Sequence, residues 1–116
     1  MPAPYKQQVT VNVTTSPVDA DKSNGILLDD GMALIGVVPT STPTNSAFTV
    51  QYSVDGTNYY DVSSLTSIAM TVNEMSHINP QDSYGLKYIR LAFSTAELTT
   101  NTTFDLHIAP VVGSLN

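Results

Sequence analysis

Hydrophobic and polar residues alternate with a period of two along much of the chain, which is the pattern of half-buried β-strands. The clearest alternation begins at Phe48, after which every second residue as far as Val54 is apolar. Similar alternations occur near both ends of the chain. The pattern predicts short strands, in chain order, over residues 8–14, 26–28, 32–38, 48–54, 59–62, 68–72, 87–94 and 104–109.

Turn signals separate these runs, and the sequence has no helical period. Asp55 and Gly56 predict a hairpin between two of the strands, because glycine supplies the positive φ that tight hairpins require. The sequence therefore predicts an all-β protein, an antiparallel β-sandwich that is jelly-roll-like, with about eight short strands. Residues 1–116 are predicted to form a single domain with an extended N-terminal arm over residues 1–8.

The predicted strand 32–38 is apolar on both faces, interrupted only by Ala33 and Gly36. Such a strand is either covered on both sides or lies at a contact between subunits. We therefore expect it to contact another subunit through Leu34 or Ile35, whichever of the two faces outward.

Composition narrows the classes of function. The 116 residues include no Cys and no Trp, and ten acidic residues against four basic ones give a formal net charge of −6. Without Cys, disulfides and thiolate metal sites are excluded. Lys6 and Lys22 lie far along the sequence from Lys87 and Arg90, so no basic stripe for nucleic acid is predicted. No apolar run approaches the ~20 residues of a membrane span, and the N-terminus has no apolar signal-peptide region.

One polar loop, from Asp19 to Asp30, spaces oxygen ligands as a calcium loop does. Its first candidate ligands are Asp19, Asp21 and Ser23, and Asp30 occupies the twelfth position. However, Gly25 falls one place late, and the last ligand is Asp where a bidentate Glu is usual. The pattern therefore favours a solvated polar loop, and neither a metal nor another cofactor is predicted.

Catalytic groups are sparse. His107 lies two residues from Asp105 on the polar face of a predicted strand, but no nucleophile motif or third group accompanies this pair or His77. The candidates for a pair of catalytic carboxylates are Asp55, Asp61 and Glu74. A structural role as the first residue of its turn explains Asp55 better than a catalytic role does. The sequence therefore predicts a protein that is not an enzyme.

Five tyrosines cluster around the central hairpin and the strand at 87–94, namely Tyr52, Tyr59, Tyr60, Tyr84 and Tyr88. An exposed aromatic group beside Asn and Asp is typical of sugar stacking or of a protein contact. The alternative places Tyr52 and Tyr60 at the rim of the core, with their hydroxyls at the surface. Both interpretations stay open, and Tyr59 and Tyr88 are the candidates for contact with a partner.

Two segments, residues 53–62 and Lys87–Leu91, together resemble a recurring β-sandwich motif pair. They are similar to the pattern S-x-D-G-x-x-[W/Y]-x-x-V followed by [K/R]-Y-I-R-[L/I] of discoidin-like carbohydrate-binding sandwiches. The same pair occurs in small virion proteins of tailed bacteriophages, including proteins that decorate capsids. Discoidin-like lectins usually carry Trp, longer ligand loops and often a terminal disulfide, and this chain lacks Trp and Cys, so it resembles the short phage proteins more.

The resemblance implies a structural virion protein of a tailed bacteriophage, a capsid decoration (cement) protein that stabilises the lattice of the major capsid protein. It also implies a homo-oligomer, with a trimer favoured, on the capsid surface and in the host cytoplasm during assembly. In the arm, Pro2, Pro4 and Tyr5 are the expected contacts with a neighbouring chain. The alternatives are a carbohydrate-binding or host-adhesion module of a phage tail and a head–tail accessory protein; no nucleic acid or membrane partner is expected.

Overall fold

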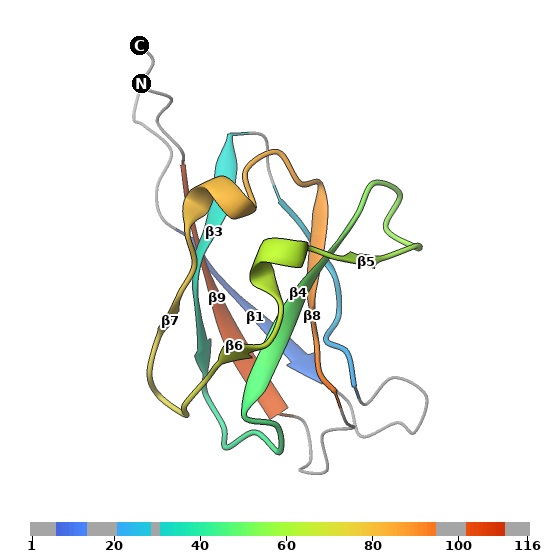
Figure 1. Cartoon of the computed structure of the whole chain (residues 1–116). Coiled ribbons are helices and arrows are strands. Elements are labelled where there is room, and N and C mark those ends of the chain that lie inside the picture. The colour runs from blue at the N-terminus through green and yellow to red at the C-terminus, as the bar shows by residue number, and fades with distance from the viewer. Residues whose placement is uncertain (1–6, 14–20, 29–30, 95–101, 111–116) are drawn as a thin grey trace.

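The computed structural model describes residues 7–13, 21–28, 31–94 and 102–110. Within these ranges the chain forms two antiparallel sheets packed face to face (Figure 1), which confirms the predicted β-sandwich. The strands are β1 (Gln7–Val13), β2 (Ile26–Leu27), β3 (Met32–Pro39), β4 (Ala47–Ser53), β5 (Tyr60–Asp61), β6 (Ile68–Ala69), β7 (Ser76–His77), β8 (Tyr88–Ala92) and β9 (Thr102–Pro110). The helical segments in these ranges are single 3₁₀ turns, η1 (Ser63–Leu65) and η2 (Pro80–Asp82).

The four-stranded sheet has the order β1-β9-β3-β7, and the five-stranded sheet has the order β2-β8-β4-β5, with β6 also paired to β4. Figure 1 shows β4 and β8 side by side in one layer, with β3, β9 and β1 in the layer behind. Neighbouring strands of a sheet are therefore mostly distant in the sequence. This topology brings residues near positions 51, 61 and 90 onto one outer face.

The core lies between the two sheets and follows the predicted alternation. Phe48 and Val50 of β4 are buried, and Phe104 of β9 stacks on Phe93 with ring centroids 5.3 Å apart. Tyr52 is half-buried against this core, at its rim. Burial of apolar side chains on one face of each sheet supplies the main driving force for folding.

A β-bulge explains why β3 is apolar on both faces. The register of β3 against β9 shifts between Leu34 and Gly36, so one extra residue, Ile35, is accommodated. As a result Leu34 and Val37 are both fully buried in the core, whereas Ile35 is half-buried. Of the two residues expected to face another subunit, Ile35 is therefore the outward one.

The edge of β3 beside the bulge is closed by the segment that follows β7. The Ser83 hydroxyl accepts a hydrogen bond from the Leu34 amide at 2.8 Å and donates to the Leu34 carbonyl at 3.3 Å. The Ile78 amide donates to the Ile35 carbonyl at 3.0 Å. Strand β7 itself pairs with Gly36 and Val37, and these bonds continue the pairing of β3 to the backbone groups of Leu34 and Ile35.

Three details of the sequence prediction need correction. Strand β7 was not predicted, because its two residues show no alternation and depend on pairing with β3. Strand β4 ends at Ser53, so Val54 lies outside it and is 72% exposed. Gln7 and Gln8 belong to β1, which shortens the predicted arm by two residues.

Candidate functional site

The outer face of the five-stranded sheet carries the polar and aromatic residues of the two motif segments. Residues of β8 alternate as predicted, with Ile89 and Leu91 buried and Tyr88, Arg90 and Ala92 on the outer face. Strand β8 pairs with β4 so that Tyr88 lies opposite Ser53 and Arg90 opposite Gln51. The two segments are therefore neighbours in the fold.

The loop between β4 and β5 is fixed by its own side chains. The Ser53 hydroxyl accepts a hydrogen bond from the Gly56 amide at 2.9 Å and donates to Asp55 Oδ1 at 2.8 Å. Asp55 Oδ1 in turn accepts from the amides of Thr57 and Asn58, at 2.8 and 2.9 Å. The backbone amides of Asn58 and Thr57 hold the pKa of the Asp55 carboxyl well below its usual range. Gly56 has φ +80°, as the turn signal predicted.

The Tyr59 ring contacts the guanidinium group of Arg90 on this outer face. The guanidinium carbon of Arg90 is 4.0 Å from the centroid of the Tyr59 ring, which is the geometry of a cation–π contact. Partial burial raises the pKa of the Tyr59 hydroxyl, while the positive charge of Arg90 acts in the opposite direction. The ring is also confined by backbone, because a Cβ at Gly25 would lie 2.1 Å from the Tyr59 hydroxyl oxygen.

A chain of side-chain hydrogen bonds crosses the strands beside this contact. Arg90 Nε donates to Gln51 Oε1 at 2.8 Å, and Gln51 Nε2 donates to Asp61 Oδ1 at 2.8 Å. Arg90, Gln51 and Asp61 thus form one row across β8, β4 and β5. We use the name polar row for these three residues. Each side chain of the row is therefore held in place by its neighbour.

Tyr88 supports the same face from the neighbouring position on β8. Its ring covers Gly56, where a Cβ would lie 3.5 Å from the ring, and the Lys87 ammonium lies 5.6 Å from the ring centroid. The structure therefore brings Tyr59 and Tyr88, both half-buried, onto one face. Tyr60, by contrast, is 62% exposed, and its ring lies beside the Tyr52 ring with centroids 6.2 Å apart.

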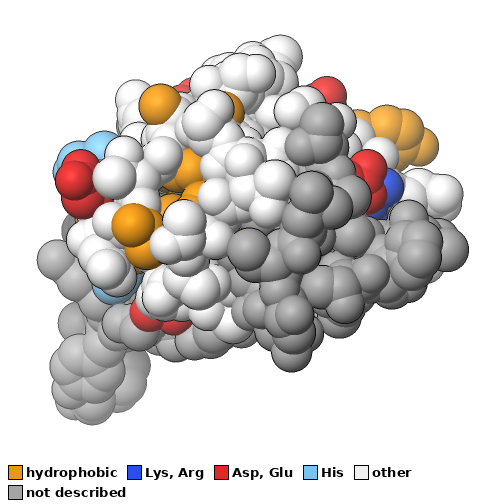
Figure 2. Space-filling model, turned by 90° about the horizontal axis from the view of Figure 1, so that it is seen from below, with side chains coloured by type: hydrophobic (Ala, Val, Ile, Leu, Met, Phe, Trp, Pro, Cys, Tyr) orange, Lys and Arg blue, Asp and Glu red, His pale blue; other side chains and the backbone are white. Residues whose placement is uncertain are grey.

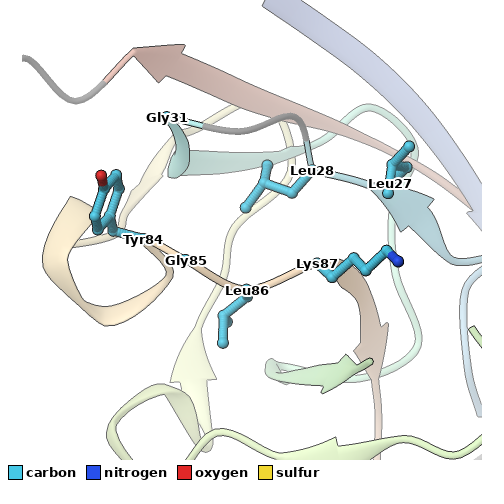
Figure 3. Close-up of a pocket in the computed structure, with 7 residues that line it drawn as sticks. All are labelled: Leu27, Leu28, Gly31, Tyr84, Gly85, Leu86 and Lys87. Atoms are coloured by element: carbon cyan, nitrogen blue, oxygen red, sulfur yellow. The ribbon is translucent and has the colours of Figure 1, made fainter. Parts of the chain in front are cut away.

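A second feature is a hollow of about 690 Å³ at one end of the sandwich (Figure 3). It lies between the segment around Leu28 and the segment 84–87, which are joined by a hydrogen bond from the Leu28 amide to the Lys87 carbonyl at 2.7 Å. Figure 3 shows Leu28 directed into the space between the segments and Tyr84 standing at one end of it. Leu27 and Tyr84, which also line the hollow, are 55% and 54% exposed. We call it the apolar hollow after its leucine side chains, although polar backbone and side-chain atoms line it as well; its lining residues are Leu27, Leu28, Gly31, Tyr84, Gly85, Leu86 and Lys87.

The remaining sequence candidates are the residues of the polar loop and the two histidines. Asp21 pairs with Lys22 at 2.9 Å, and the buried Ser23 hydroxyl accepts from the Leu91 amide, so neither is aimed at a calcium ion. Asp19 and Asp30 lie outside the described residues. His77 and His107 both lie opposite Gly36 of β3, on separate strands. Among the described residues, no group of three His, Cys, Asp or Glu side chains could hold a metal ion.

Other expectations concern the arm and the surface. Pro2, Pro4 and Tyr5 lie outside the described residues. In the described ranges, no helix is long and apolar enough to cross a membrane. Figure 2, which views the sandwich from below, shows hydrophobic side chains in separate small patches among uncharged atoms, with few charged groups between them.

Sequence reasoning did not find the polar row. The alternation over residues 87–94 predicts which side chains of this strand face outward, but the contacts of Arg90 with Gln51 and Tyr59 depend on the register of β8 against β4. The one indication in the sequence was that Arg90 is charged, whereas the other outward residues of β8, Tyr88 and Ala92, are aromatic or apolar. Comparison of the chain with protein-family models, with curated proteins and with solved structures finds no match.

Proposed function

We propose that the protein is a structural virion protein of a tailed bacteriophage that decorates the capsid and stabilises the lattice of its major capsid protein. The starting point is the resemblance of residues 53–62 and Lys87–Leu91 to small phage virion proteins. Support comes from the direct contacts between these segments, which include the pairing of Ser53 with Tyr88 and the stacking of Tyr59 on Arg90. The two segments thus act as one structural motif.

We also infer that the sandwich is a jelly roll. Of the nine strands in the described ranges, the two-residue β6 adds only to one edge of β4, and without it eight strands remain. Renumbered, they give the orders 1-8-3-6 and 2-7-4-5, in which the chain crosses between the sheets at nearly every connection. This order supports a jelly roll, an architecture found in viral capsid and lectin domains.

The observation that carries the proposal is the apolar hollow. Two large apolar or aromatic side chains, Leu27 and Tyr84, are more than half exposed at its rim. Protein interfaces combine aromatic and apolar residues with few charges at their centre, and an apolar side chain of a partner fits such a hollow. Of the described residues that line the hollow, Lys87 is the charged one. We therefore assign the contact with the capsid lattice to this end of the sandwich.

Association of the protein with itself is proposed for the outer face of the four-stranded sheet. Ile35 is the outward residue of the bulge in β3, and Met75, the residue before β7, is 46% exposed and lies over Gly36 of β3. A small symmetric oligomer, a trimer in our proposal, would bind several lattice sites at once. Multivalent binding to the assembled lattice stabilises it by mass action and by effective concentration.

Co-sedimentation with capsids tests the assignment. Capsids assembled from the major capsid protein of the same phage are mixed with the wild-type protein, with Leu27→Asp or with the control Val54→Asp. Val54 is an exposed apolar residue, 72% exposed, that lies outside the hollow, so the same substitution there should leave binding unchanged. Leu27→Asp should weaken binding by about tenfold or more, as expected for a charge placed in an apolar contact.

Two results would contradict this proposal. Equal binding of both variants and wild type would remove the apolar hollow from the capsid contact. Absence of the protein from the capsid shell of purified virions, seen by electron microscopy with a specific label, would reject decoration itself. A label at the head–tail junction would support the accessory role in its place.

A second candidate function, a carbohydrate-binding or host-adhesion module of a phage tail, is favoured by a separate observation. Tyr59 and Tyr88 share one outward face with the polar row, and sugars bind to such combinations of aromatic rings and hydrogen-bonding side chains. A label on the tail, together with binding to oligosaccharides, would favour this function.

A further inference from the structure

We infer that the outer face of the five-stranded sheet holds a binding groove for a neutral oligosaccharide. The inference deepens the second candidate function and names its site and ligand class. It does not depend on capsid decoration, because the residues concerned are separate from those of the apolar hollow.

The groove has a floor of small side chains. Thr49 of β4 lies opposite Ala92 of β8, and Ala47 lies further along β4 on the same face. A hollow of about 300 Å³ lies over these residues, at the lower end of the range for sites that bind small molecules. The small floor lets a flat sugar ring approach the sheet closely.

Hydrogen-bonding groups form the two sides of the groove. On one side, Lys22 forms a β-bridge with Ala92 and an ion pair with Asp21. On the other side, Asp61 is exposed and is held by Gln51 through its Oδ1 atom. No hydrogen bond to Asp61 Oδ2 occurs among the described residues, so this oxygen can accept a bond from a ligand hydroxyl.

The aromatic part of the site lies in the next register row. Arg90 donates to Gln51, which lines the groove, and carries the Tyr59 ring on its guanidinium group. The Tyr59 ring lies outside the residues that line the groove, one register row away on the same outer face, where a ligand longer than the groove would meet an aromatic side chain of the kind that packs against the C–H face of a sugar. The site therefore combines a flat apolar group with both donors and acceptors, which is the combination of groups that a pyranose presents.

The equal numbers of positive and negative side chains at the site favour a neutral ligand over an anionic one. Lys22 and Arg90 are two of the four cationic residues of the chain, and each is connected to a carboxylate, directly in Lys22–Asp21 and through Gln51 in Arg90–Asp61. The site thus contains two cations and two anions, in a protein of net charge −6. An anionic ligand gains no net attraction from this arrangement, whereas hydroxyl groups can bind to charged donors and acceptors alike.

The test measures binding of defined oligosaccharides to the full-length protein. The probes are four neutral hexasaccharides (maltohexaose, cellohexaose, xylohexaose and mannohexaose) and one anionic chain, hexagalacturonic acid. Isothermal titration calorimetry gives affinities, and ¹⁵N–¹H correlation spectra locate the site from shifted amides. We expect at least one neutral probe to bind and to shift the amides of Thr49, Gln51 and Ala92, and hexagalacturonic acid to bind more weakly.

Two matched variants test the location. Ala92→Gln places a long side chain across the floor of the groove, and Thr71→Gln introduces the same side chain at an exposed position after β6, outside the groove residues. Ala92→Gln should weaken binding by about tenfold or more, while Thr71→Gln should change it by less than about twofold. Asp61→Ala, which removes the ligand acceptor, should weaken binding by a similar factor of about ten.

The outcomes separate the site from the other proposals. Absence of binding by every neutral probe at millimolar concentration, tighter binding of hexagalacturonic acid, or equal affinities of Ala92→Gln and Thr71→Gln would each overturn the inference. Loss of oligosaccharide binding by Ala92→Gln with unchanged capsid co-sedimentation would support the groove as a separate site. Loss of capsid binding by Leu27→Asp with unchanged oligosaccharide binding would support the same separation from the other side.

Discussion

Ser83 offers the sharpest test of how the bulged strand β3 is held in place. The side chain is fully buried, and its hydroxyl oxygen is the acceptor for the Leu34 amide at 2.8 Å. Ser83→Ala removes this acceptor while leaving the backbone of the η2 segment unchanged. Because Leu34 is also fully buried, water cannot replace the lost partner without opening the fold.

The size of the effect follows from the cost of an unsatisfied buried donor. Leaving a buried amide without a partner costs roughly 1–3 kcal/mol, and the second, longer bond to the Leu34 carbonyl at 3.3 Å is lost as well. We therefore expect Ser83→Ala to lower the free energy of unfolding by about 2 kcal/mol. For a domain of this length, that corresponds to a fall in melting temperature of about 8 °C.

Urea unfolding followed by far-ultraviolet circular dichroism measures this change. The control is Ser64→Ala, a change to an exposed serine of η1 whose hydroxyl has no hydrogen bond among the described residues. The control should shift the free energy of unfolding by less than about 0.5 kcal/mol, with the same dependence on urea as wild type. A shift for Ser83→Ala no larger than that of the control would show that Leu34 finds another partner and would refute the reasoning.

Three further predictions follow from the turn, the bulge and the arm. The Asp55 carboxyl has a pKa below its ordinary value of 3.8 when folded, so its contribution to the free energy of unfolding is complete above pH 3.8 and is lost as the pH falls further. Thermal melts from pH 7 to pH 2 should therefore show that the difference in melting temperature between wild type and Asp55→Asn narrows below pH 4. A difference that stays constant over this range would contradict the prediction. Ile35→Asp should fold yet sediment as a smaller species than wild type, whereas Leu34→Asp should not fold; an unchanged sedimentation coefficient for Ile35→Asp would remove this face from self-association. Deletion of residues 1–6, which keeps all of β1, should weaken capsid binding while lowering the melting temperature by less than about 3 °C, and equal capsid affinity would exclude the arm from the contact.

The fold could be predicted from the sequence wherever a strand has one buried face. In β4 and β9 every second side chain is apolar, and the structure buries that set, including Val50 and Leu106. The positive φ of Gly56 was equally predictable, because the turn signal requires a residue without a side chain. Such features depend on local pattern alone.

Other features could not be predicted because they depend on partners distant in the sequence. The bulge at Ile35 exists because β9 pairs with both Leu34 and Gly36, and the two-residue β7 exists because β3 offers it an edge. The Tyr59–Arg90 contact joins residues 31 positions apart and requires the register of β4 against β8, which neither strand's pattern specifies.

The arrangement of the two proposed surfaces along β8 has a consequence for function. The apolar hollow includes Lys87, immediately before β8, and the groove includes Ala92, its last residue. Five residue steps of an extended strand separate these positions by about 17 Å. Since a partner side chain seated in the hollow would approach one end of the strand, the groove at the other end would stay accessible to solvent. A protein fixed to a capsid through the hollow can therefore still present the groove outward, so decoration of a lattice and binding of an oligosaccharide are compatible activities of one sandwich.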